Sequence, residues 1–101
     1  MLRISVWQFA LLLFANPVFA DDSVRGYVLA SPCMSCHGPN GKSPGYIPSI
    51  QGQEAGYIKD KLIGFKNGTE EATVMDRLSK GYSDTEIDMI AEYFASLKST
   101  R

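Results

Sequence analysis

The chain has 101 residues, with 11 acidic and 10 basic side chains and a formal net charge of −1. This length allows one small domain. The basic residues form no cluster, which argues against a nucleic-acid partner.

Residues 1–20 have the composition of a secretory signal peptide. Arg3 precedes an apolar run over residues 4–15, and Val18-Phe19-Ala20 has small residues at the positions that a signal peptidase reads. The run is short for a membrane span. We therefore expect cleavage after Ala20, export to the periplasm and no membrane span in the mature chain; a retained N-terminal anchor is the alternative. Residues 21–101 would form an 81-residue domain, small enough to need a disulfide, a metal or a cofactor.

The first half of the mature chain predicts two helices separated by a loop. Asp22 or Ser23 could cap a short first helix, which Pro32 would end because the residue before a proline avoids helical angles. The segment 38–52 contains four glycines and three prolines, so we expect a loop without regular structure. Apolar residues at helical spacing predict a second helix from Glu54 to Lys66, with Asn67-Gly68 as its stop.

The second half predicts a short helical turn over residues 76–80 and a long final helix. Ser83 and Glu86 match a capping box at the start of that helix. The residues that follow at helical spacing form one apolar stripe: Ile87, Ile90, Ala91, Phe94 and Leu97. We expect the first and last helices to cross near Gly26, where the missing side chain permits close approach. No segment alternates as a strand would, so the predicted fold class is all-α.

Residues 33–37 read Cys-Met-Ser-Cys-His, the CxxCH signature of covalent haem attachment. Two thiols separated by two residues on one helical turn can each add to one vinyl group of a haem. The next residue, His37, then directs its imidazole toward the iron. It is the only histidine of the chain, so any imidazole ligand must be His37, with its second ring nitrogen donating to a backbone carbonyl. The predicted cofactor is one covalent haem c.

Three other uses of this cysteine pair are open. A thioredoxin-like redox pair needs a preceding strand and a surrounding sheet, and the sequence predicts neither. A structural zinc site needs about four protein ligands, whereas the chain offers two cysteines and one histidine. A simple disulfide that staples an interaction domain is the third use, and it would leave the protein without haem.

The chain offers four methionines as a second axial ligand, and thioether sulfur is a common partner of histidine in electron-transfer haems. Met1 leaves with the signal peptide, Met34 lies inside the attachment motif, and Met89 lies about 200° round the final helix from Ile87, away from the apolar stripe. Met75 remains as the predicted ligand. The alternative is that Met75 is an ordinary core residue.

Over essentially the whole mature chain, the sequence resembles a class I cytochrome c. Besides the motif at residues 33–37, the segment Pro48-Ser49-Ile50-Gln51-Gly52 is similar to the Pro-x-Leu-x-Gly segment of that family. The resemblance implies three to five helices around one covalent haem. It also implies that the Pro48 carbonyl accepts the hydrogen bond of the ligand histidine and that Ile50 packs on the haem. Further candidates for the apolar shell are Leu29, Ile47, Tyr57, Leu62, Phe65, Ile90 and Phe94.

Within the class, residues 73–83 resemble most closely the haem subunit of flavocytochrome c sulfide dehydrogenase, which carries a similar Met-x-Arg-x-x-Lys-Gly-Tyr stretch. The implied function is one-electron transfer without substrate chemistry, between a redox donor and acceptor that could include a flavoprotein sulfide dehydrogenase. Many such subunits carry two haem domains, whereas this chain has one CxxCH, so a free single-haem carrier is equally compatible. A haem sensor or small enzyme with an open axial site is the alternative function.

Overall fold

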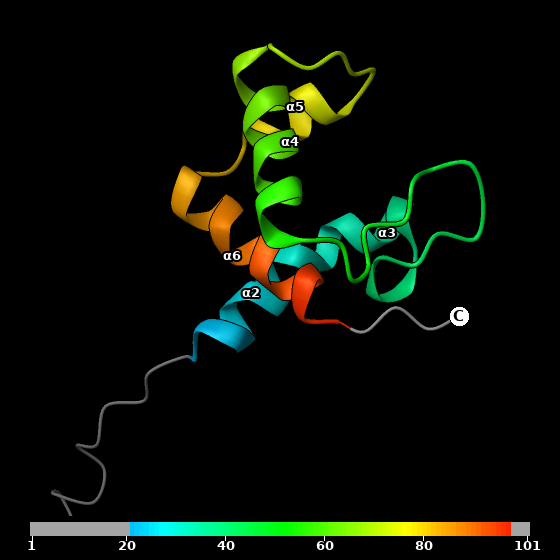
Figure 1. Ribbon diagram of the computed structural model, residues 1–101, viewed down its shortest axis with the longest axis vertical. Helices are drawn as coiled ribbons and strands as arrows, with labels where there is room; N and C mark the ends of the chain where they lie inside the picture. The colour runs from blue at the N-terminus through cyan, green and yellow to red at the C-terminus, as the bar shows by residue number, and fades with distance from the viewer. Residues whose placement is uncertain (1–20, 98–101) are drawn as a thin grey trace, which may run out of the picture.

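The structure is a computed structural model that describes residues 21–97. The predicted signal peptide, residues 1–20, lies outside these residues. Every regular element within residues 21–97 is a helix, which confirms the all-α prediction (Figure 1). No helix in this part of the chain has the length and apolar character that a membrane span requires.

The first described helix, α2, spans Asp22–Ala30 and is capped by Asp21 rather than by Asp22 or Ser23. The Asp21 backbone is extended, and its carboxylate accepts a hydrogen bond from the Ser23 hydroxyl at 2.9 Å. Three consecutive polar residues at this helix start can all cap, and the apolar periodicity does not choose among them. Beyond Ala30 the chain tightens into the 3₁₀ turn η1, Ser31–Cys33, which contains Pro32.

The later helices lie within one residue of their predicted bounds. Helix α4 spans Ala55–Asn67 and ends at Gly68 in the left-handed conformation, and α5 spans Met75–Ser79. The predicted loop contains one short turn, η2, over Pro39–Gly41. Asn40 at its centre has non-helical angles, with a φ of 55°, and Gly41 follows with a φ of 80°, so this turn is not a regular helix.

Helix α6, Asp84–Ser96, has the predicted capping box. The Glu86 N–H donates to the Ser83 hydroxyl at 3.1 Å, and the Ser83 N–H donates to the Glu86 carboxylate at 2.9 Å. The buried stripe of this helix consists of Ile87, Ile90, Ala91 and Phe94, with Leu97 partly buried after it. The predicted capping and periodicity are therefore confirmed.

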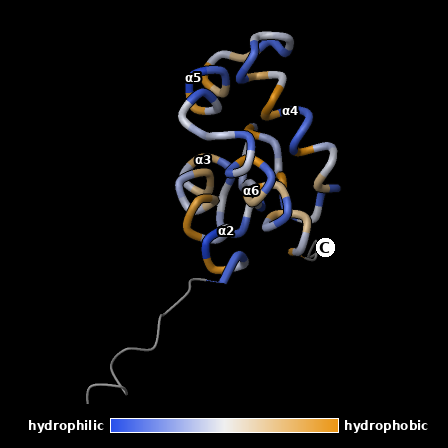
Figure 2. The backbone as a smooth tube through the Cα atoms, turned by 90° about the vertical axis from the view of Figure 1, so that its left-hand side faces the viewer, coloured by the Kyte–Doolittle hydropathy of each residue, from blue (hydrophilic) through white to orange (hydrophobic). Residues whose placement is uncertain are grey.

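The core forms where α2 and α4 pack on α6. Ile90, Ala91 and Phe94 of α6 meet Ala30 of α2 and Ile58 of α4, and apolar and polar stretches alternate along α4 as one-sided burial requires (Figure 2). Helices α2 and α6 cross at the buried Gly26, where an added Cβ would lie 3.1 Å from the Met89 carbonyl oxygen and 3.5 Å from Tyr93 Cβ. The predicted crossing point is confirmed.

Candidate functional site

The two cysteines and the histidine lie on consecutive helical turns. Cys33 ends η1, and Cys36 and His37 belong to the short helix α3, Met34–His37. Cys33 is half-buried against the core, whereas Cys36 is exposed, and both are free thiols. The disulfide alternative is thus not formed in this structure, and the two sulfur atoms remain available for another bond.

The imidazole of His37 is oriented by a backbone carbonyl from a distant part of the chain. His37 Nδ1 lies 2.6 Å from the Pro48 oxygen. A carbonyl only accepts, so Nδ1 carries the proton and donates. Nε2 then holds the lone pair and is the nitrogen left for a metal. This is the arrangement in which a second partner fixes the orientation of a ligating imidazole and raises its basicity.

Two sets of hydrogen bonds hold the segment that carries Pro48. The Gly41 carbonyl accepts from the backbone N–H groups of Ile50 at 2.8 Å and of Gln51 at 3.1 Å. The Ser49 hydroxyl accepts a hydrogen bond from the Ser43 backbone N–H at 2.8 Å, and the Ser49 carbonyl accepts one from the Gln53 side-chain amide at 2.6 Å. Sequence reasoning missed the roles of Ser49 and Gln53, because no spacing rule connects a loop residue with its cross-loop partner.

Only some of the residues predicted to form the apolar shell around the haem are buried in the structure. Ile90 and Phe94 are buried, and Leu29, Ile50 and Leu62 are partly buried against the core cluster. Phe65 is also half-buried. By contrast, Ile47 and Tyr57 are 42% and 54% exposed. Ile50 is the best placed of the loop residues, since it touches the core and follows Pro48 by two positions.

The three methionines of the described chain lie in different surroundings. Met75 is half-buried at the first position of α5, and α5 lies above α3 along the long axis in both views (Figures 1 and 2). Met34 is adjacent to Cys33 and packs against the core. Met89 lines a groove between α2 and α6. Met75 therefore belongs to a helix, α5, that lies apart from both the attachment motif and the groove between α2 and α6.

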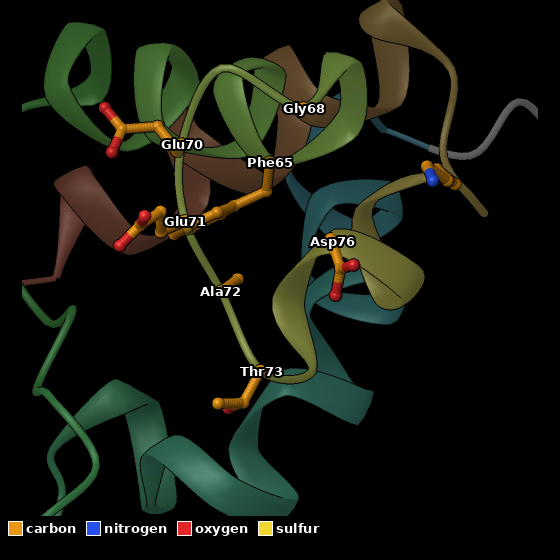
Figure 3. Close-up of a pocket in the computed structure, with 8 residues that line it drawn as sticks. Phe65, Gly68, Glu70, Glu71, Ala72, Thr73 and Asp76 are labelled. Atoms are coloured by element: carbon orange, nitrogen blue, oxygen red, sulfur yellow. The ribbon is translucent and has the colours of Figure 1, made fainter.

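An open cavity of about 620 Å³ lies between α4 and α5, and neither cysteine lines it. Its walls come from α4, from the segment that follows it and from α5, with Phe65 reaching from α4 toward Glu71 and with Asp76 across from them (Figure 3). Three carboxylates, Glu70, Glu71 and Asp76, line it. None of the residues 33–37 lines this cavity, so it is distinct from the attachment site.

Burial and nearby charge shift the pKa values of Cys33 and of a neighbouring tyrosine. Burial raises the pKa of the Cys33 thiol, against a smaller lowering by a backbone hydrogen bond. The pKa of the Tyr82 phenol is also raised, first by burial and then by the charges of Cys33 and Glu86. Tyr82 joins α5 to α6, so the link between the final helices borders the attachment site.

These residues fit a group that is bonded to the protein through sulfur and that brings most of its own metal ligands. Within residues 21–97, no three histidine, cysteine or acidic side chains gather closely enough to hold a metal ion by themselves. The zinc alternative therefore has no support in this part of the chain. Two thiols, with an imidazole whose Nε2 is free to bind, suit an iron already held by a porphyrin.

Comparison with known proteins agrees with this reading. The chain is 51% identical over 73 residues to the cytochrome subunit of sulfide dehydrogenase of Chlorobaculum tepidum, covering 72% of this chain and 66% of the relative. It is 33% identical to cytochrome c-553 of Nitratidesulfovibrio vulgaris, covering 96% of this chain and 100% of that protein. Cytochrome c4 of Acidithiobacillus ferrooxidans superposes with a TM-score of 0.69 at 29% identity, covering 80% of this chain and 53% of that one.

The chain spans two thirds or less of several curated relatives, and as little as 28% of one of them. The cytochrome c family model matches residues 23–98, which includes the attachment motif, the Pro48 segment and Met75. This match confirms the predicted haem c cofactor and the electron-transfer class. The chain belongs to the cytochrome c family.

Proposed function

We propose that this protein is a periplasmic one-electron carrier whose haem iron is ligated by His37 and Met75. The observation that carries the proposal is the 2.6 Å hydrogen bond from His37 Nδ1 to the Pro48 carbonyl, next to two free thiols at residues 33 and 36. When bound, the haem supplies a reversible Fe(III)/Fe(II) couple. The chain's own residues hold the cofactor, orient the imidazole and exclude water from part of the site.

Each residue has a separate role in this proposal. Cys33 and Cys36 would hold the haem through two thioether bonds, and His37 Nε2 would bind its iron. Met75 of α5 would be the second protein ligand, and its thioether sulfur would raise the potential because it favours the ferrous iron. The Pro48 carbonyl keeps the imidazole in one tautomer, and Ile50 contributes apolar surface. The predicted signal peptide, residues 1–20, would direct the chain to the compartment in which the haem is attached.

Substitution of Met75 tests the ligation. The holoprotein with Met75→Ala should lose its methionine-ligated spectrum, bind carbon monoxide rapidly when reduced and show a lower potential. Met89→Ala is the matched control, because Met89 lies between α2 and α6, and it should leave all three measurements unchanged. A Met75→Ala spectrum identical to that of the parent protein would refute the ligation. Carbon monoxide binding to the parent protein at neutral pH would favour the sensor or open-site alternative.

The donor that we favour is a sulfide-oxidising flavoprotein, because of the 51% identity to the cytochrome subunit of a sulfide dehydrogenase. A free single-haem carrier is the second candidate, supported by the end-to-end match to a cytochrome c-553. Stopped-flow mixing of the oxidised holoprotein with sulfide, with and without a sulfide dehydrogenase flavoprotein, separates these candidates. Reduction accelerated by the flavoprotein supports the first. Reduction at the rate of sulfide alone supports the second.

A further inference from the structure

Helix α2 presents an apolar stripe to solvent that the fold does not use. Val24, Tyr27 and Val28 lie at positions i, i+3 and i+4, and these residues are 55%, 51% and 60% exposed. The other face of α2 already packs on α6 through the buried Gly26 and Ala30. The stripe is therefore additional to the core, and exposed apolar side chains that gather on one face indicate an interaction surface.

A groove of about 400 Å³ lies between α2 and α6, beside this stripe. Gly26, Met89 and Tyr93 contribute to its lining, and Tyr93 stands edge-on to Tyr27 with ring centroids 5.7 Å apart. Tyr27 thus connects the groove to the stripe. The volume falls within the roughly 300–1,000 Å³ of clefts that accept a ligand or a partner's side chain. Apolar and polar stretches alternate along α2 in Figure 2.

The groove is acidic. Asp22, Asp88 and Glu92 line it, and no lysine or arginine does. Asp88 pairs with Lys59 of α4 at 2.8 Å, whereas Asp22 and Glu92 form no ion pair within residues 21–97. Helix α6 has no basic residue, and its other two carboxylates, Asp84 and Glu86, lie outside the groove, where Asp84 pairs with Lys66 at 3.0 Å. A binding partner must therefore bring positive charge, because like charges in an interface are strongly unfavourable.

None of the residues of the stripe or the groove belongs to α3, to the segment 38–52 or to α5. In Figure 1, α2 lies at the end of the molecule opposite to α5. A molecule bound to α2 would thus leave the helix that carries Met75 and the loop that carries Pro48 uncovered. Attachment through α2 and α6 is compatible with electron exchange elsewhere on the surface.

We propose that the stripe and the groove together form a docking surface for a basic amphipathic segment of a partner protein. The apolar side chains of that segment would cover Val24, Tyr27 and Val28, while a lysine or arginine enters the groove near Glu92. This inference goes beyond the electron-carrier function, because it does not depend on the axial ligands or on the donor.

The test is an NMR titration of the reduced holoprotein with a synthetic amphipathic helical peptide of leucine and lysine. Amide shifts should concentrate on α2 and on the second half of α6, and the same peptide with glutamate in place of lysine should not bind. Glu92→Lys should weaken binding about tenfold, or about 1.4 kcal/mol. Glu71→Lys makes the same charge change on the segment between α4 and α5 and should alter the Kd less than about twofold.

A second pair of variants tests the apolar stripe. Val28→Ser should weaken binding, whereas Tyr46→Ser, on a residue that is fully exposed in the 38–52 segment, should not. Each variant is first checked for an unchanged haem spectrum and thermal transition, so that an unfolded protein is not counted.

Four results would overturn the proposal. The first is a set of shifts gathered around α3 and α5, and the second is an equal loss of affinity in Glu71→Lys and Glu92→Lys. The third is a gain of affinity on removing residues 98–101, which would assign the groove to Lys98 and Arg101 of the chain itself. The fourth is a concentration-dependent dimer that Val28→Ser abolishes, which would assign the surface to a second copy.

Discussion

Gly41 sits at the point where the Pro48 segment, the core and the attachment site meet, so its replacement should disturb all three. Its φ angle is +80°, and an added Cβ would lie 2.9 Å from Phe94 Cδ1 and 3.0 Å from Ile50 Cγ1. Real Cβ atoms rarely come so close to other heavy atoms. Alanine at a positive φ costs about 1–2 kcal/mol, and overpacking of a core adds about 1–3 kcal/mol. Gly41→Ala should therefore lower the free energy of unfolding by about 2–5 kcal/mol.

Two other glycines separate the backbone cost from the packing cost. Gly68 has a φ of +85° but nothing within 4 Å of an added Cβ, so Gly68→Ala should cost only the backbone part, about 1–2 kcal/mol. Gly45 also has open space and no positive φ. Gly45→Ala should be neutral or stabilising by less than about 1 kcal/mol, because it restricts the unfolded chain.

Urea unfolding of the three holoproteins, followed by far-ultraviolet circular dichroism, measures this series. A domain of this size has a total stability of about 4–12 kcal/mol, so Gly41→Ala should shift the midpoint strongly. The Gly41 carbonyl also accepts hydrogen bonds from the Ile50 and Gln51 N–H groups. The same variant should therefore weaken the hydrogen bond from His37 to the Pro48 carbonyl and alter the haem spectrum. Equal losses in Gly41→Ala and Gly68→Ala would refute the packing argument, and an unchanged spectrum would refute the coupling to Pro48.

Three further variants test the final helix. Ser83→Ala removes the N-cap of α6 and should cost about 1 kcal/mol in thermal or urea unfolding; a loss below a few tenths would show that the cap contributes little. The hydrogen bond from the Ser83 backbone, the largest cause, lowers the pKa of Glu86. A carboxyl pKa that is lower in the folded than in the unfolded protein stabilises the fold. This stabilisation is complete above the pKa of the unfolded state, about 4.3, and is lost as the pH falls through the pKa of the folded state. Glu86→Gln should therefore reduce the loss of stability on acidification, and an unchanged dependence of stability on pH would refute this role of the cap. Phe94 is fully buried, and Phe94→Ala should cost about 3–5 kcal/mol in urea unfolding; a cost near 1 kcal/mol would mean that the core collapses around the missing ring.

The helices were predictable because their signals are local. The capping pair Ser83 and Glu86 lies three residues apart, and the buried positions of α6 recur at helical spacing, so neither depends on the rest of the fold. The errors are at helix ends, where several residues satisfy the same rule. Asp21 rather than Asp22 caps α2 because the choice depends on which backbone is extended, and the sequence does not encode this locally.

The attachment motif is also a local signal, since covalent chemistry requires both cysteines and the histidine within five residues. The amino-acid sequence alone therefore identified the cofactor and the candidate iron ligand His37. The role of Pro48 was available only through the family resemblance. It is separated from His37 by 11 positions, and no spacing rule connects them.

Tertiary structure decided which groups surround the site and which remain exposed. Gly41 brings the Pro48 segment onto Phe94, and Ser49 and Gln53 hold it there through contacts across the loop. It also decided that Val24, Tyr27 and Val28 stay exposed, although their apolar character suggests burial. One face of helix α2 packs against α6. The small residues Gly26 and Ala30 occupy that face, because two closely packed helices leave no room there for larger side chains.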